Sequence, residues 1–204
     1  MRQKQTFKEF LLEAFSDLGK LSPEELTKGQ RLEVEDDGNF NEVDGRVFKQ
    51  ALTQIRYNDI AKMDKGLPYR GLVSLSVYGV KDYNNMACYL GINNSSGYAI
   101  AGGNELVSVF STSGSSGRAI VGDAIKNGVT HLDCFAEMNP KSGKFAGKLF
   151  GLYSSMGFKV DTNMNHGGEY PVKKGISVVY QENGEPEYST DNPDNVNVVI
   201  YMKL

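Results

Sequence analysis

The apolar residues in the first third of the chain recur with the period of an α-helix. A capping box precedes the first series and a glycine follows it. The members of this series are Phe7, Phe10, Leu11, Ala14, Phe15 and Leu18. A second series, over residues 47–55, follows Asp44, which can cap a helix. We therefore expect residues 1–65 to form an N-terminal helical extension that begins with a helix over residues 7–18.

Beyond residue 66 the pattern changes to short apolar runs, several of which alternate with polar residues. Such runs predict β-strands over residues 72–78, 86–92, 97–101, 105–111, 129–135, 176–181 and 195–202. Two segments among them have helical spacing, one over residues 117–127 and one that opens at Asn139 and ends at Gly157. Strands and helices in this order imply a right-handed crossover and a mixed sheet. The predicted fold is α/β (α+β mixed), with residues 66–204 as a single domain.

Composition and charge are those of an ordinary globular protein. The chain has 204 residues, of which 40% are hydrophobic and 23% charged, and its formal net charge is −3. It has no long basic run, so we expect no binding to duplex nucleic acid. We expect no membrane span either, because no apolar run is long enough. Cys88 and Cys134 lie in apolar stretches, which predicts buried free thiols and a reducing, cytoplasmic environment.

A turn rich in glycine and serine, residues 112–117, separates the predicted strand 105–111 from the predicted helix 117–127. The first turn of a helix has unpaired backbone N–H groups and a partial positive charge, so such a turn can hold a phosphate. Its glycines would let an anion approach the backbone closely. The spacing fits neither the Walker A pattern nor the dinucleotide-binding pattern. The turn therefore either binds an anion or only connects the strand to the helix.

Three stretches around this turn form a pattern through their order and spacing. Gly117-Arg118-Ala119 stands between a predicted strand and a predicted helix, and Leu152-Tyr153-Ser154-Ser155-Met156-Gly157-Phe158 ends the next helix. Residues 128–135 form an apolar strand between them. In this order they resemble the G-x-[GA] part of the acetyl-coenzyme A loop, the L-Y-x-x-x-G-F motif and the parting strand of the GNAT N-acetyltransferase family. The resemblance covers residues 70–204 and is to divergent members carried by bacteriophages and prophages.

This resemblance implies a GNAT-like twisted mixed β-sheet flanked by helices, and acetyl-coenzyme A (acetyl-CoA) as the cofactor. The residues that it places at the cofactor are Val109, Ser111, Gly114, Ser115, Ser116, Gly117, Arg118 and Ala119. The family pattern is [QR]-x-x-G-x-[GA], and its first position is glycine here, at Gly114. The side chain that helps to hold the pyrophosphate in relatives is therefore missing. Arg118 and Lys148 are the cations that could take its place.

The resemblance also implies roles in catalysis. Tyr153 corresponds to the tyrosine that protonates the departing coenzyme A thiolate in many GNAT enzymes. The alternative for Tyr153 is a core tyrosine on an amphipathic helix. Three carboxylates lie on or near the central strands and could serve as the base that deprotonates an amine. These are Glu105, Asp133 and Glu137.

A metal site is not expected. On a strand, residues three apart point to opposite faces, so His131 and Cys134 can neither share one ion nor form a nucleophilic pair. The acidic residues that begin at Asp37 lack the glycine and the glutamate that a calcium loop needs at its sixth and twelfth positions.

Two classes of function remain open. The first is an acetyl-CoA-dependent N-acyltransferase of phage or prophage type, which acts on a small-molecule or protein amine by direct transfer. The second is a non-catalytic GNAT-like phage protein with a structural, virion or interaction role. The apolar face of helix 7–18 must be buried, either on its own domain or in a homo-oligomer or phage assembly. The expected location is the host cytoplasm, or the virion for a structural protein.

Overall fold

The structure of the protein is a computed structural model that describes residues 39–68, 72, 75, 77–92, 94–112, 117–164 and 174–204. The helix predicted over residues 7–18 lies outside these residues, and so does the assembly role expected of it. Gly114, Ser115 and Ser116 of the predicted cofactor loop also lie outside them.

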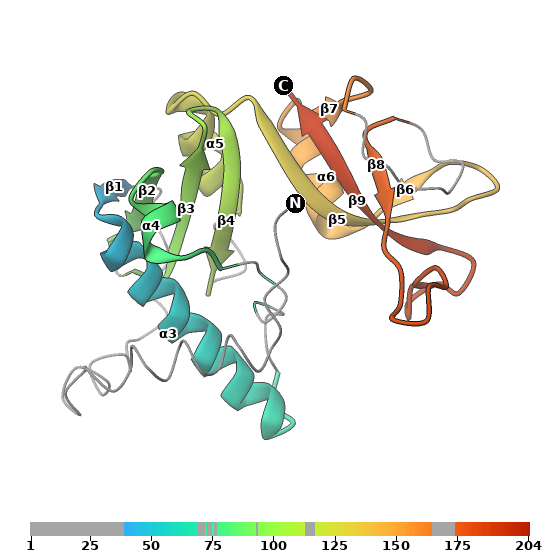
Figure 1. Cartoon of the computed structure of the whole chain (residues 1–204), viewed down its shortest axis with the longest axis horizontal. Coiled ribbons are helices and arrows are strands. Elements are labelled where there is room, and N and C mark those ends of the chain that lie inside the picture. The colour runs from blue at the N-terminus through green and yellow to red at the C-terminus, as the bar shows by residue number, and fades with distance from the viewer. Residues whose placement is uncertain are drawn as a thin grey trace.

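The described chain forms one sheet with helices packed on it (Figure 1). Its strands are β1 (Phe40–Val43), β2 (Ala87–Gly91), β3 (Ser96–Ala101), β4 (Glu105–Ser111), β5 (His131–Met138), β6 (Phe145–Ala146), β7 (Lys159–Val160), β8 (Ile176–Val178) and β9 (Val196–Lys203). Its helices are α3 (Gly45–Asp64), α4 (Val80–Tyr83), α5 (Gly117–Lys126) and α6 (Lys148–Ser155). Neighbouring strands run in the order β1-β2-β3-β4-β5-β9-β7, with β6 beside β5 and β8 beside β9.

The sheet is mixed, as the order of the predicted elements requires. β4 and β5 pair in parallel, and the other pairs of described strands are antiparallel. Parallel neighbours need a crossover connection, and α5 supplies it. The prediction of a mixed α/β fold is therefore confirmed at this level.

Helices cover both faces of β1–β4, which we call the first half of the sheet. α3 and α4 pack on one face and α5 on the other, because alternate residues of β3 and β4 contact opposite layers. The buried residues of these helices include Phe48, Leu52 and Ile55 in α3, Tyr83 in α4, and Ile120, Val121 and Ala124 in α5. The Asp44 side chain accepts a hydrogen bond from the backbone N–H of Arg46 and caps α3, as predicted. Residues 40–64, expected in the N-terminal extension, thus pair with and pack on this half.

A small hydrogen-bond network fastens α5 to β3. The Tyr98 hydroxyl donates to Asp123 Oδ2 over 2.6 Å and accepts from Asn127 Nδ2 over 2.9 Å. The Tyr98 ring stacks on that of Tyr89, with centroids 4.8 Å apart. Burial raises the pKa of the Tyr98 phenol far above its usual value, and the Asp123 carboxylate raises it further. The phenol therefore keeps its proton at neutral pH and donates it to the carboxylate.

Only one face of β5–β9, the second half of the sheet, is covered by a described helix. The even-numbered residues of β5 and β9 lie in the core beside α6. The odd-numbered residues face the other way, so we call this side the open face. Phe135, on the open face of β5, is 55% exposed. The alternation of buried and accessible residues along both strands is the signature of a half-covered sheet.

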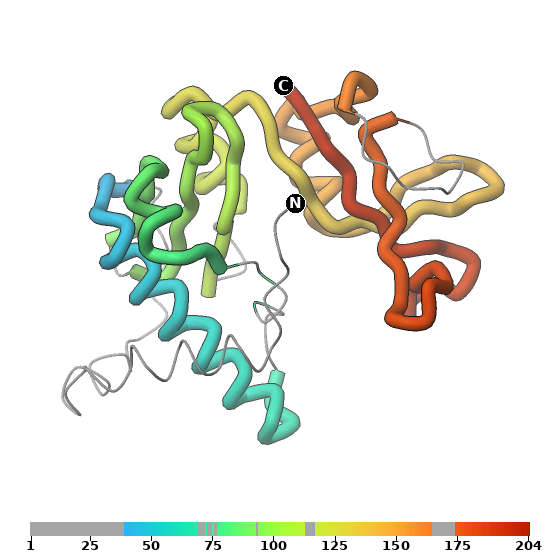
Figure 2. Tube along the Cα trace, in the orientation of Figure 1, coloured from blue at the N-terminus to red at the C-terminus, as the bar shows by residue number. Residues whose placement is uncertain are grey.

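β4 and β5 pair only at their first residues and then part. Their register joins Glu105 with His131 and Leu106 with Leu132, and goes no further. A β-bulge follows in β4, where two residues stand opposite Tyr98 of β3. Ser108, in the bulge, has a φ of 53°, in the left-handed region that non-glycine residues rarely adopt. A bulge bends its strand and increases its twist, which carries β4 away from β5. The divergence is visible in the ribbon and in the chain trace (Figures 1 and 2).

Two predicted elements are wrong in their extent. The helix expected from Asn139 begins only at Lys148, because a turn at Gly143 and the short strand β6 precede it. Gly143 and Gly147 have φ of 64° and 115°, which an α-helix does not allow. Of the strand expected over residues 72–78, the described residues are not in a strand. Asp59 and Arg56 of α3 instead bind the backbone N–H and C=O of Leu72.

Candidate functional site

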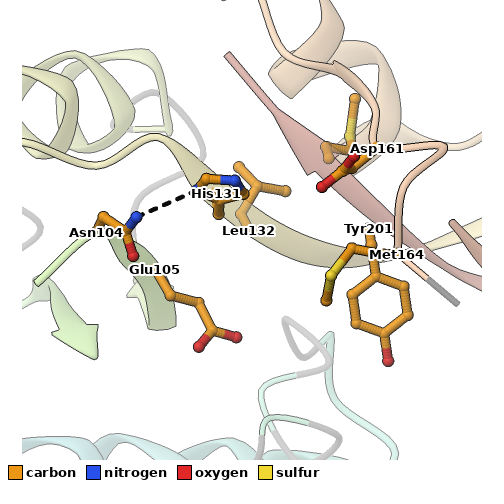
Figure 3. Close-up of a pocket in the computed structure, with 8 residues that line it drawn as sticks. Asn104, Glu105, His131, Leu132, Asp161, Met164 and Tyr201 are labelled. Atoms are coloured by element: carbon orange, nitrogen blue, oxygen red, sulfur yellow. Dashed lines mark hydrogen bonds between the residues drawn. The ribbon is translucent and has the colours of Figure 1, made fainter. Parts of the chain in front are cut away.

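An open pocket lies where β4 and β5 begin side by side (Figure 3). Its volume is about 310 Å³. The turn before β4, the start of β5, the end of β9 and the segment after β7 supply its walls. Its lining includes Asn104, Glu105, His131, Asp161, Met164 and Tyr201. The pocket thus brings Glu105, one of the predicted bases, together with residues from the C-terminal part of the chain.

Two of the predicted bases lie close to the Tyr201 side chain. Asp133 stands directly opposite Tyr201 in the pairing of β5 with β9, so both side chains lie on the open face. Burial raises the pKa of the Tyr201 phenol, and the negative charges of Asp133 and Glu105 raise it further, against a hydrogen bond with Ser177. The phenol therefore keeps its proton beside two carboxylates. The pocket lining includes Glu105 and Tyr201 but not Asp133.

His131 lines the pocket next to Asn104, to which a dashed line joins it (Figure 3). Its Nδ1 atom is 2.8 Å from Thr130 Oγ1 and 3.4 Å from Asn104 Nδ2. Because the amide nitrogen of Asn104 can only donate, Nδ1 is the acceptor, and in the neutral ring the proton is on Nε2.

An ion pair lies at one wall of the pocket. Lys203 Nζ is 3.2 Å from Asp161 Oδ1. A hydrogen bond from the backbone N–H of Asn163 lowers the pKa of the Asp161 carboxyl, and Lys203 lowers it further. The Asp161 carboxylate therefore already interacts with Lys203 and with the Asn163 backbone N–H. Glu105 is the pocket carboxylate that lies at the start of the parting strands.

Tyr153 lies on the opposite side of the sheet from Glu105. It comes from α6, is 4% exposed, and its ring packs edge-on against Phe158. Burial raises the pKa of its phenol well above the usual value, and the charges of Cys134 and Asp133 raise it further. The structure therefore places Tyr153 in the core, on the face that α6 covers. A phenol in this position holds its proton and could act only as an acid.

The described part of the predicted cofactor loop begins α5. Gly117, Arg118 and Ala119 form the first turn of this helix, and Arg118 is exposed. A Cβ atom added at Gly117 would lie 3.0 Å from Leu152 Cδ2, so this glycine also allows α5 to approach α6. Val109 and Ser111 lie in β4, half-buried, and Lys148 is the exposed first residue of α6.

One buried polar atom lies near the same end of the sheet. The Ser96 hydroxyl is fully buried and has no hydrogen-bond partner among the described residues. Ser96 stands opposite Ser111, the last residue of β4, in the pairing of β3 with β4. The backbone N–H groups at the start of a helix are donors that a phosphate can use.

The cysteines and histidines form no metal centre within the described ranges. No group of three or more His, Cys, Asp or Glu side chains that could hold an ion is found there. Cys134 is buried beside Met202, whereas His131 lines the pocket. Burial raises the pKa of Cys88 to about 11 and that of Cys134 to about 12, so both thiols stay protonated.

Sequence reasoning missed Tyr201 and the place of His131 in the pocket. The alternation in residues 196–203, with apolar residues at even positions, could have put Tyr201 on a separate face from the core. Nothing in the sequence gives the register that sets Tyr201 opposite Asp133. Pairing between strands about 70 residues apart is a tertiary property that local patterns do not encode.

The comparisons with known proteins add no relative. Neither the protein-family models, nor the curated proteins, nor the solved structures contain a match to this chain. Within the described residues, no helix is both long and apolar enough to cross a membrane.

Proposed function

We propose that this protein is an acyl-coenzyme A-dependent N-acyltransferase that acts on an amine held in the pocket beside Glu105. The observation that carries the proposal is the parting of β4 and β5 after two residue pairs. The pocket with the Glu105 carboxylate lies where the two strands are still paired, and Tyr153 is buried on the other face of the sheet. The resemblance of residues 128–135 to the parting strand of GNAT folds supports the same assignment.

Direct transfer needs a base that takes the proton of the attacking amine and an acid that protonates the departing thiolate. Acetyl-coenzyme A, when bound, supplies an acyl group activated as a thioester. Glu105 takes up the proton that the attacking amine loses, on the open face. Tyr153, on the α6 face, would be the acid that protonates the departing thiolate. Burial raises the pKa of Tyr153, so the phenol is protonated before transfer but is a weaker acid than an ordinary tyrosine.

The phosphates of the cofactor belong at the N-terminus of α5. The backbone N–H groups of Gly117, Arg118 and Ala119 have no carbonyl of their own helix to donate to. The helix dipole adds partial positive charge at this end.

The experiment is a binding measurement followed by a transfer assay. Calorimetry with acetyl-coenzyme A is expected to give saturable binding, and release of free coenzyme A thiol across a panel of amines reports transfer. Glu105→Gln should lower turnover by about 10²- to 10⁴-fold and leave cofactor affinity unchanged. Glu42→Gln, in β1 at the far edge of the sheet, is the matched control and should behave as wild type. Wild-type protein that binds no acetyl-coenzyme A would overturn the proposal.

Asp133→Asn decides between the two carboxylates near Tyr201. If Glu105 is the base, this change should lower turnover by less than about tenfold, because Asp133 is outside the pocket lining. Tyr153→Phe should lower turnover by about 10²-fold with cofactor affinity retained, since its hydroxyl acts only in the transition state.

The second candidate is a non-catalytic module that keeps the cofactor fold. Two observations favour it: Tyr153 is packed in the core, and the loop has Gly114 where relatives have Gln or Arg. Such a protein would bind coenzyme A weakly or not at all and release no thiol with any amine. Cofactor binding without turnover in the same assays would select this candidate.

A further inference from the structure

We propose that the acceptor amine is a linear aliphatic diamine, which the pocket holds at both ends between the carboxylates of Glu105 and Asp161. The proposal rests on the function proposed above and names the class of its substrate. The two carboxylates line the same pocket but come from different walls (Figure 3). Glu105 begins β4, whereas Asp161 follows β7. A ligand between these walls can therefore bind one carboxylate at each of its ends.

Asp161 has one carboxylate oxygen that its neighbours do not use. The residue is only 5% exposed. Its Oδ1 atom accepts from the backbone N–H of Asn163 over 3.1 Å and lies 3.2 Å from Lys203 Nζ. Its Oδ2 atom has no hydrogen-bond partner among the described residues and is not among the fully enclosed polar atoms, so a ligand in the pocket can reach it. Because the oxygens of a mostly buried carboxylate normally accept hydrogen bonds, this atom indicates a donor on a ligand.

The charges around the pocket favour a cationic ligand. Glu105 and Asp161 line the pocket. Asp133, which stands opposite Tyr201 in the pairing of β5 with β9, adds a third carboxylate nearby. Among the described residues, no lysine or arginine lines the pocket, and the ammonium group of Lys203 is held by Asp161. The pocket therefore attracts an ammonium group and repels a carboxylate on a ligand.

The remaining lining suits a short chain of methylene groups. Leu132, Met164 and Met202 supply apolar surface, and the Tyr201 ring adds more. The volume of about 310 Å³ is at the lower end of the range for small-molecule sites. Two ammonium groups joined by methylene groups match this lining, because the charged ends bind the carboxylates and the middle contacts apolar side chains.

In this arrangement one end of the diamine reacts and the other end is an anchor. At Glu105 the nitrogen is deprotonated and attacks the acyl carbonyl, which forms the amide C–N bond and breaks the C–S bond of the thioester. The products are the monoacylated diamine, the free thiol of coenzyme A and one proton. The second ammonium group stays on Asp161 and holds the reacting end in place.

The test compares ligands that share one carbon chain and differ at its far end. Calorimetry on the full-length chain, without acetyl-coenzyme A, compares 1,4-diaminobutane with 1-aminobutane and 4-aminobutanoate. We expect the diamine to bind at least about tenfold more tightly than 1-aminobutane, the gain from a second charge-assisted hydrogen bond. We expect 4-aminobutanoate to bind more weakly than 1-aminobutane, because its carboxylate meets Asp161.

Substitutions in the two walls separate the two ends of the ligand. Asp161→Asn should weaken diamine binding by about tenfold and remove the advantage over 1-aminobutane. Glu105→Gln should weaken the binding of both amines. Lys203→Met removes the cation that competes for Asp161 and should strengthen diamine binding. Asp191→Asn, exposed in the loop between β8 and β9, is the matched control and should behave as wild type.

The other outcomes separate this inference from the proposed function. Equal affinities of wild type for 1,4-diaminobutane and 1-aminobutane would overturn the inference and leave the proposed function standing. An unchanged diamine affinity in Asp161→Asn would do the same. If that variant does not fold, weaker diamine binding by Lys203→Met would overturn the inference. Diamine binding by a wild type that binds no acetyl-coenzyme A would support the diamine site and overturn the proposed function.

Discussion

The two halves of the sheet differ in how many of their faces are covered. The first half has α3 and α4 on one face and α5 on the other, whereas in the second half the described helix α6 covers one face. The pocket lies at the junction, and its walls come from both halves. A half with both faces covered beside a half with an accessible face is a suitable arrangement for a binding site, because the first can hold the geometry and the second can receive the ligand.

Individual aromatic side chains in the two halves differ in the same way, one enclosed and one exposed. Tyr98 in the first half is enclosed by a ring stack and two hydrogen bonds. Phe135 in the second half projects from the open face with more than half of its surface exposed. The predictions below test whether stability is distributed as this contrast implies.

The largest effect is expected for Phe48→Ala in the core of the first half. Phe48 is fully buried and its ring contacts those of Tyr83 and Phe110. Truncation leaves a cavity and should lower the free energy of unfolding by about 3–5 kcal/mol. Phe135→Ala, the matched change on the open face, should cost less than about 1 kcal/mol. Denaturant unfolding of both variants measures the contrast. A large loss for Phe135→Ala would show that another part of the protein covers the open face in solution.

The fold could be predicted from the sequence where local patterns and turn chemistry agree. Strand β4 and the start of α5 lie where alternation and helical spacing placed them, and Gly128 follows α5 with a φ of 94°. The start of α6 could not be predicted, since apolar residues such as Phe145 fit a helix and a short strand equally well. Gly147 was the residue that could have indicated the start of α6, because glycine can adopt the positive φ found just before Lys148.

The candidate site could be predicted only in part. Glu105 was found because it begins a recognisable strand before a recognisable turn. Tyr201 and His131 join it through the pairing of β9 with β5 and of β5 with β4. The bulge at Ser108 also gives no local signal, because serine is not a residue that usually adopts positive φ. Tertiary contacts, including the hydrogen bond between Ser108 Oγ and the Tyr83 hydroxyl, hold it there.

A second, smaller effect is expected for Tyr98→Phe. The change keeps the stacked ring but removes the hydroxyl that bridges Asp123 and Asn127. The carboxylate loses a short hydrogen bond, so the free energy of unfolding should fall by about 1–3 kcal/mol. Tyr153→Phe removes a hydroxyl from the core of the second half, where the ring packs on Phe158, and should cost less. Thermal and denaturant unfolding give both values, and equal losses would contradict the assigned role of the network.

The alkylation rates of the two buried thiols show which half of the sheet unfolds locally more easily. Cys88 lies in the first half and Cys134 in the second, and the raised pKa values of about 11 and 12 keep both unreactive while they are buried. Alkylation at pH 8 therefore requires local opening. We expect Cys134 to be modified about tenfold faster than Cys88 in mild denaturant, a difference of about 1.4 kcal/mol in opening free energy. Mass spectrometry of the labelled peptides measures the two rates. Equal rates would mean that the halves open as one unit.

The smallest effect concerns the ion pair at the end of the second half. Hydrogen bonding from the Asn163 backbone N–H and the charge of Lys203 lower the pKa of Asp161, so its folded pKa lies below the unfolded value of about 3.9. A group with a lowered folded pKa stabilises the protein above the unfolded pKa, and this contribution is lost as the pH falls through the folded pKa. Asp161→Asn should therefore melt slightly below wild type at pH 5–7, and the two melting temperatures should converge as the pH falls below about 4. Lys203→Met, which leaves the Asn163 contact in place, should have a smaller effect over the same range. A gap between wild type and Asp161→Asn that stays constant down to pH 2 would mean that the carboxylate charge contributes nothing there.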